Sequence, residues 1–375
     1  MNNFCSMKYF YKNFIVVIFL FCSAASYATH LKGGEIRVTH ISNLTYKATA
    51  LVYFDAGTAV TNAEQELMMC MGDGQVVKAA RQSLSALPGA SSTSIGIYEA
   101  TYTYPTSGRY QISASIANRN TGILNLPNSE SSPMFLWTVF DTSLGNSTPA
   151  SPNLQFTGGV RQLFTQDLKV TDVNGDSVSF HLQKLSRAFP GTCGIRTTDQ
   201  SYVYPNEVSK SGTLKIDQIT KKLIWNAPAQ TGNYSIAYVV DEWRDGIIIS
   251  QTYREGLITV SDKPGETVDI PAYEYPADNG IINALPHLDT PEISIAVEAY
   301  PVPTDDFVNV KAYSKSRSII TLQLINMQGR ILQQIRSRSA EIVVQEQFDL
   351  RDYPKGMYLI RAENDMESIT QKILR

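Results

Sequence analysis

Apolar and polar residues alternate along most of the chain, in short runs separated by turn residues. The runs at 98–104 and 110–116 show this alternation, and the segment between them, 105–109, contains Pro, Ser and Gly. The same pattern recurs at 214–220 and 320–324. Because successive side chains of an extended chain point to opposite faces, a period of two residues predicts half-buried β-strands. The alternation therefore predicts an all-β protein built from strands and tight turns.

Proline-bearing junctions divide this pattern into three strand-rich units. The junction at 147–152 contains two prolines, and the segment 263–295 contains several more, which interrupt any regular alternation. We expect a β-sandwich on each side of the first junction, then an extended linker, and a third sandwich at the C-terminal end. The expected boundaries are two central sandwiches at 29–145 and 146–262, the linker at 263–295, and the last sandwich at 296–375.

The first residues of the chain, 1–28, have the order of a secretory signal peptide. Two lysines precede an apolar run at 14–21, and a stretch of small residues ends at Ala28. The apolar run is much shorter than the roughly 20 residues that a membrane-spanning helix requires. We therefore expect export, with cleavage between Ala28 and Thr29.

The amino-acid composition argues against several classes of function but identifies none. The chain has 32 basic and 35 acidic residues, and its net charge is -3. This balance gives no support to a nucleic-acid-binding surface, which requires clustered cations. The four His and four Cys are too few to suggest a transition-metal site or a disulfide scaffold. Removal of the signal peptide would leave Cys70 and Cys193, which fall in different predicted sandwiches, so we expect two buried free thiols rather than a disulfide.

Common catalytic motifs are missing from the sequence. It has no Gly-x-Ser-x-Gly elbow, no His-Glu-x-x-His zinc helix and no phosphate-binding loop. Cys193 and the upstream His181 would suit a thiol nucleophile and its base. No local signature surrounds them, so we expect a structural cysteine beside a turn and an unrelated strand histidine. We also expect a solvated charge cluster formed by Asp241, Glu242, Arg244 and Arg254.

One acidic segment has the spacing of a calcium-binding loop. Asp172, Asn174 and Asp176 place three oxygen-bearing side chains at alternate positions, with Gly175 among them. Calcium prefers such hard oxygen ligands, although the segment lacks the closing Glu of a twelve-residue EF-hand loop. Asp, Asn and Gly are also the residues that turns favour. We expect a plain hairpin turn here, with calcium binding as the alternative, and we expect no other cofactor.

The central region resembles known surface modules. A Gly-Asp-Gly turn at 72–74 followed by an aromatic-Pro-x-x-Gly-x-Tyr hairpin at 104–110 is similar to the polycystic-kidney-disease type of immunoglobulin-like repeat. The segment 214–236 resembles cadherin-like and related immunoglobulin-like domains. The segments 30–36 and 118–125 resemble gliding-motility-associated surface proteins of Bacteroidetes. These resemblances imply tandem immunoglobulin-like β-sandwich domains on a cell surface.

The C-terminal unit carries four short motifs in order: Tyr-Pro-x-Pro, Asn-x-x-Gly, Pro-Lys-Gly-x-Tyr and Lys-x-x-Arg. Their residues are Tyr300, Pro301, Pro303, Asn326, Gly329, Pro354, Lys355, Gly356, Tyr358, Lys372 and Arg375. Together they closely resemble the type A sorting domain of the type IX secretion system, in which Asn is commonest at the position of Val302. The resemblance implies a β-sandwich sorting domain, recognised by the type IX machinery and removed by its C-terminal signal peptidase. It also implies that the passenger is attached to surface lipopolysaccharide or released.

Together these features predict a secreted or cell-surface protein without enzymatic activity, which acts in adhesion or envelope interaction through an unknown protein or glycan ligand. Loops at the ends of tandem sandwiches can carry binding without altering the core. Two alternatives stay open. A carbohydrate-binding module would show a flat platform of exposed Tyr and Trp rings. A hydrolase would show a deep pocket with converging carboxylates, or a contact between Cys193 and His181.

Overall fold

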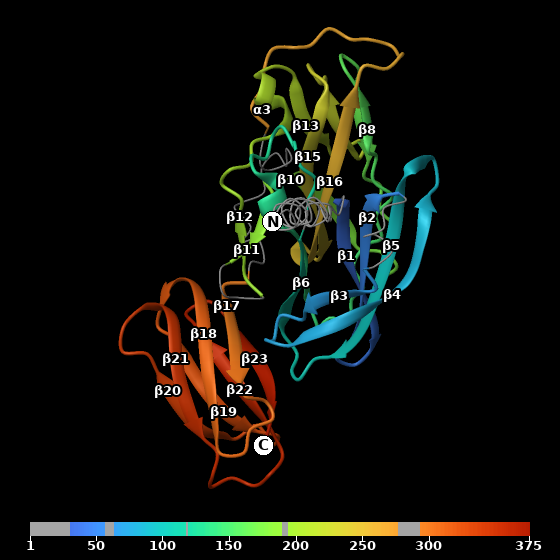
Figure 1. Cartoon of the computed structure of the whole chain (residues 1–375). Helices are drawn as coiled ribbons and strands as arrows, with labels where there is room; N and C mark the ends of the chain where they lie inside the picture. Colours follow the sequence, from blue (N-terminus) through green and yellow to red (C-terminus); the bar gives the residue numbers. More distant parts are fainter. Residues whose placement is uncertain (1–30, 57–63, 118, 190–193, 277–292) are drawn as a thin grey trace, which may run out of the picture.

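The computed structural model describes residues 31–56, 64–117, 119–189, 194–276 and 293–375, and most of them lie in β-strands (Figure 1). Helical structure in this described part is limited to a 3-10 turn, Ser129–Ser131, and a short helix, α3 (Pro205–Ser209). The all-β fold predicted from the alternation is therefore confirmed. None of the helices described here is long and apolar enough to cross a membrane.

The largest sheet takes strands from both sides of residue 145. In spatial order its strands are β1 (Leu31–Ser42), β2 (Thr45–Asp55), β5 (Ala90–Thr103), β4 (Val76–Leu87), β3 (Glu66–Cys70), β6 (Arg109–Ile116), β7 (Met134–Asp141), β16 (Ile247–Ser261), β15 (Gly232–Arg244) and β10 (Ser177–Leu182). A short strand, β8 (Thr157–Gly159), pairs in parallel with β16. The strands on the two sides of the predicted 145/146 boundary thus share one hydrogen-bonded sheet.

This sheet closes on itself where β1 meets β16. Gly33 pairs with Gly256 and Gly34 pairs with Glu255, so the strands from β1 to β16 form a ring. A Cβ atom at Gly33 would lie 2.3 Å from the backbone oxygen of Glu255, and one at Gly34 would lie 2.7 Å from Leu136 Cδ1. Gly33 is therefore required by the close approach of β1 to β16, whereas Gly34 is required by the packing of Leu136 and Leu51 against β1.

Smaller sheets complete the larger unit. One contains β13 (Thr213–Asp217), β14 (Lys222–Asn226) and β9 (Phe164–Asp167), and another contains β11 (Ser186–Ala188) and β12 (Arg196–Thr198). Aromatic rings fill the interior between strands. Trp137 stacks on Tyr253 with ring centroids 5.5 Å apart, and Trp225 meets Tyr234 edge to face at 4.9 Å. Such aromatic pairs add specific geometry to the burial of apolar area.

The C-terminal unit is a separate seven-strand β-sandwich (Figure 1, orange to red). One sheet contains β17 (Ile295–Tyr300), β18 (Phe307–Ser318) and β21 (Glu341–Asp349), and the other contains β20 (Ile331–Arg336), β19 (Thr321–Asn326), β22 (Met357–Glu363) and β23 (Ser368–Leu374). Ile320, Leu322 and Leu324 are all fully buried, as their alternation predicted. This unit touches the larger one through a small apolar contact in which Ile195 packs with Ala296 and Tyr313.

Candidate functional site

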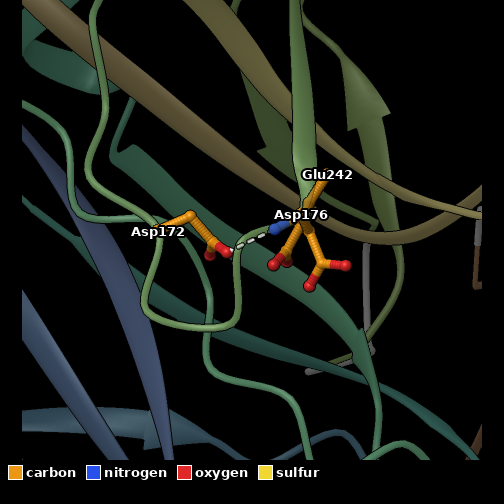
Figure 2. A group of neighbouring side chains, drawn as sticks. All are labelled: Asp172, Asp176 and Glu242. Carbon is orange, nitrogen blue, oxygen red and sulfur yellow. Dashed lines mark hydrogen bonds between the residues drawn. The ribbon is translucent and has the colours of Figure 1, made fainter.

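Three carboxylates converge where the loop before β10 passes β15. Asp172 and Asp176 come from the loop and Glu242 from β15, and their ligand oxygens all lie within 4.8 Å of one another. Figure 2 shows the carboxylates of Asp176 and Glu242 together, with Asp172 facing them from the loop. The antiparallel register of β10 with β15, which pairs Val178 with Glu242, brings the loop to this place.

The loop is a turn but not the hairpin turn that the sequence predicts, because it leads from β9, which pairs with β14, to β10, which pairs with β15. Asp172 Oδ1 accepts hydrogen bonds from the backbone N–H groups of Asn174 at 3.1 Å and Asp176 at 2.7 Å. Gly175 has a φ of 82°, a left-handed conformation that favours glycine. The Asn174 Oδ1 accepts a hydrogen bond from the backbone N–H of Ser147 at 3.1 Å. Of the three predicted ligands, Asp172 and Asp176 belong to the group of converging carboxylates.

Glu242 is the fully buried member of the cluster. Its Oε2 accepts hydrogen bonds from Asn146 Nδ2 at 2.7 Å and from the Ser250 hydroxyl. Its Oε1 is buried without a hydrogen-bond partner, and so is Asp172 Oδ2. Burial and, less strongly, the charge of Asp172 raise the pKa of Glu242 to about 8, although the hydrogen bond from Ser250 opposes the rise. A carboxyl in this position favours its neutral form unless a positive charge comes close.

The cation of this cluster in the structure is Arg244, which pairs with Asp176. Its Nε donates to Asp176 Oδ1 at 2.8 Å and its Nη2 donates to Asp176 Oδ2 at 2.6 Å. These hydrogen bonds hold the pKa of Asp176 below its usual value. Nη2 also donates to Asn146 Oδ1 at 3.0 Å, so Asn146 links Arg244 to Glu242. The guanidinium of Arg244 thus bonds directly to Asp176, and it is linked to Glu242 only through the side-chain amide of Asn146.

Sequence reasoning missed Glu242 because it placed the residue in a solvated charge cluster. That prediction is wrong for Asp241, Glu242 and Arg254, which are 5%, 0% and 0% exposed. The strand β15 is covered on both faces, since every residue from Tyr234 to Glu242 is buried. A continuous apolar run such as 236–240 is typical of a strand with two covered faces. This run could have indicated that Asp241 and Glu242, which follow it in the same strand, are buried as well.

Of the two cysteines expected to remain after cleavage of the signal peptide, the described residues include Cys70. Cys70 is disulfide-bonded, which corrects the expectation of a free thiol at this position. Cys193 lies outside the described residues, so the expectation that it is a structural cysteine unrelated to His181 is not tested. His181 itself lies against Asp241, with Nδ1 2.6 Å from Oδ2. The signal cleavage site, Ala28 and Thr29, also falls outside the described residues.

The C-terminal motif residues build the turns and the end of the sandwich. Asn326 Oδ1 accepts from the backbone N–H groups of Gln328 at 3.1 Å and Arg330 at 2.9 Å, and Gly329 takes the left-handed conformation that this turn needs, with φ at 79°. Tyr358 donates its hydroxyl to Pro354 O at 2.5 Å. The Asn-x-x-Gly and Pro-Lys-Gly-x-Tyr motifs are therefore explained by turn geometry.

Arg375, at the end of β23, connects this strand to neighbouring loops of the sandwich. Arg375 exchanges backbone hydrogen bonds with Gly356 at 2.9 and 3.1 Å. Its guanidinium donates to Asp305 O at 2.7 Å and to Tyr353 O. Tyr300 lies at the edge of the other sheet, with its hydroxyl accepting from Gln345 Nε2 at 3.2 Å, while the chain continues through Pro301 and Pro303. The remaining motif residues, Lys355 and Lys372, have exposed side chains.

Comparison with known proteins identifies this unit. Residues 298–374 match the family described as a secretion system C-terminal sorting domain. None of the curated proteins matches the chain. A solved structure titled "Biofilm associated protein - BSP domain" aligns with 94% of this chain and 67% of its own at 6% identity, with a TM-score of 0.16, which is too low to support an argument. The chain therefore ends in a sorting domain of the type IX secretion system, which directs it to the outside of the cell or to the cell surface.

Proposed function

We propose that this exported chain is a non-enzymatic surface protein whose passenger, about residues 29–262, serves adhesion or envelope interaction. The observation that carries the proposal is the sorting domain at 298–374, which supports export of the rest of the chain. A passenger at that location meets surfaces, glycans and other cells. Attachment to lipopolysaccharide or release, implied by the resemblance to type A sorting domains, belongs to the same proposal, as does an origin in the Bacteroidetes.

The arrangement of buried charges supports a binding role over a catalytic one. Arg254 pairs with Glu35, and Arg119 pairs with Glu255, and all four side chains are at most 2% exposed. His181 is held by Asp241, whose other oxygen accepts from Gln251 Nε2 at 2.6 Å. These charged groups pair with one another inside the fold, which supports a structural role for them. The loops at the ends of the sheet are left to carry recognition.

The carbohydrate-binding alternative has no specific support in the described residues. Trp137 and Trp225 are 0% and 1% exposed, and they lie in the core. Among the exposed large hydrophobic side chains of the described chain, the aromatic ones are Tyr275 and Tyr300, which lie on opposite sides of the segment 277–292, one in each unit. No tryptophan of the described chain is among the exposed side chains that could extend these two rings into a stacking platform.

Export and binding can be tested separately. In a type IX-competent host, we expect the full chain to appear at the surface or in the medium, and a chain that ends at residue 295 to stay in the periplasm. The secreted protein is then presented to whole cells and to a panel of polysaccharides and envelope extracts. Saturable binding without release of a product is the expected result. Hydrolysis of any of these materials by the purified protein would contradict the non-enzymatic proposal.

A further inference from the structure

The carboxylate cluster carries more negative charge than its protein partners neutralise. It contains the three carboxylates of Asp172, Asp176 and Glu242. One guanidinium, that of Arg244, pairs with Asp176. When all three carboxyl groups are ionised, two negative charges are left without a cation within the cluster. Like charges this close raise the free energy of the fully ionised state, unless a further cation comes between them.

Two unsatisfied oxygens provide an independent observation. Glu242 Oε1 and Asp172 Oδ2 are buried and make no hydrogen bond, and Glu242 as a residue is 0% exposed. Buried polar atoms in folded proteins almost always have a partner, because an unmade hydrogen bond costs about 1–3 kcal/mol. Here the two atoms belong to the same cluster. In each carboxylate, the other oxygen accepts the hydrogen bonds, and this one accepts none. When both carboxyl groups are ionised, the structure thus presents two acceptors that no donor of the described chain occupies.

We propose that Asp172, Asp176 and Glu242 bind a divalent cation of the calcium type. All the donors are oxygens, which suit calcium and magnesium and are poor ligands for a thiolate- or imidazole-preferring metal. Calcium tolerates irregular geometry and takes additional water ligands, whereas magnesium demands a regular octahedron. Asp172 and Asp176 are only partly buried as residues, so water can approach the cluster from the loop side, although Asp172 Oδ2 itself is buried. This favours calcium.

The cation would connect segments that are distant in the sequence. Asp172 and Asp176 belong to the loop before β10, whereas Glu242 belongs to β15. Asn146, from the segment that joins the two halves of the sheet, already bonds to both Glu242 and Arg244. Binding would therefore brace the loop and this joining segment against β15. The inference goes beyond the proposed function, because it holds whether or not the protein is an adhesin.

The test uses the full secreted chain, treated with a chelator and dialysed, and titrates it with CaCl2 or MgCl2 by calorimetry and thermal melting. Asp172→Asn and Glu242→Gln are the test variants. In each, the amide oxygen can keep the existing hydrogen bonds while the NH2 group replaces the unsatisfied oxygen. Asp217→Asn is the matched control, because Asp217 Oδ1 also accepts from two backbone N–H groups of a turn, at 2.9 and 3.1 Å, and it is not part of the cluster.

We expect one calcium per chain, with a Kd of about 10⁻⁴–10⁻³ M or tighter, as in extracellular modules, and weaker binding of magnesium. Both test variants should lose at least about tenfold in affinity and lose the calcium-dependent rise in melting temperature, whereas Asp217→Asn should keep both. If Glu242→Gln fails to fold, Asp172→Asn decides the question. Absence of saturable calcium binding to the unmodified chain, or affinity that both test variants retain, would overturn the proposal. Equal affinity for magnesium would overturn the assignment to calcium.

Discussion

Arg254 Nε lies 2.6 Å from Glu35 Oε2, and neither side chain is exposed to solvent. The pair joins β16 to β1, beside the place where the ring of strands closes. Arg254 also donates to the Tyr238 hydroxyl at 2.6 Å and to Pro152 O at 2.8 Å. Burial lowers the pKa of an arginine, but the charge of Glu35 and the hydroxyls of Tyr238 and Tyr53 outweigh it, so the pKa of Arg254 is raised. Arg254 therefore stays cationic, and its pair with Glu35 connects the two halves of the sheet.

We predict that Arg254→Met destabilises the larger unit by about 3–5 kcal/mol, because it leaves the Glu35 carboxylate buried with Arg37 as its remaining cation. Lys78→Met is the control. It removes an ion pair of the same sheet, with Glu66 at 3.0 Å, whose side chains are 65% and 54% exposed, so it should cost at most about 1 kcal/mol. Urea unfolding followed by tryptophan fluorescence measures both. Equal effects of the two variants would show that the buried pair contributes no more than an exposed one.

The Gly-Gly pair at the ring closure allows a second prediction. A Cβ at Gly33 would lie 2.3 Å from Glu255 O, so Gly33→Ala should push β1 away from β16 and cost about 2 kcal/mol or more. Gly108→Ala is a matched control, because its φ of 158° is close to the 156° of Gly33 while its nearest neighbour, Tyr110 Cε2, is 3.9 Å away. Thermal unfolding should show a large loss for the first variant and a small one for the second. A similar loss in both would mean that backbone conformation, and not the strand contact, explains the glycine.

A third prediction concerns the pH dependence of stability. Asp73 is fully buried, and burial raises its pKa even though the hydroxyl of Tyr102, 2.6 Å away, stabilises its ionised form. Because the folded-state pKa is above the unfolded value of about 4, the contribution of Asp73 to stability is present below that pH and is lost as the pH rises through the folded-state pKa. In Asp73→Asn, the amide oxygen can keep the hydrogen bond from the Gln75 N–H, and the amide can donate to Tyr102.

The measurement is the free energy of unfolding of both proteins from pH 4 to pH 8. We expect the stability of the unmodified chain, relative to Asp73→Asn, to decrease as the pH rises above about 4 and then to level off. A difference that stays constant would show that Asp73 is as easily ionised in the folded state as in the unfolded chain, and one that grows with pH would show that it is more easily ionised in the folded state.

Short stretches of sequence were enough to predict those strands and turns that depend only on neighbouring residues. The alternation at 320–324 predicted a strand with one buried face, and Ile320, Leu322 and Leu324 are buried. The turn at Asp172 likewise follows from the preferences of Asp, Asn and Gly. Glu242 could not be placed beside Asp172 in this way, because their proximity depends on the register between β10 and β15, and no short segment encodes that register. The burial of charged side chains such as Arg254 and Glu35 could not be predicted for the same reason, since a charged residue is expected at the surface until its partner on another strand is known.

The last prediction concerns Arg375, whose motif position in the sorting domain has a structural explanation. Its guanidinium donates to Asp305 O and Tyr353 O, and its backbone pairs with Gly356, so it holds the end of β23 to two loops of the sandwich. Arg375→Ala should therefore lower the stability of the C-terminal unit by about 1–3 kcal/mol and should reduce the amount of protein exported. Arg330→Ala removes the same charge from an exposed turn position of this unit, so its stability and its export should stay within the range of the unmodified chain. The two variants are compared, in a type IX-competent host, by the fraction of protein in the medium or on the cell surface and by melting of the purified chain. An equal loss of export in both would indicate that the machinery senses total positive charge, whereas normal export of Arg375→Ala would show that the closed end of the sandwich is not needed for recognition.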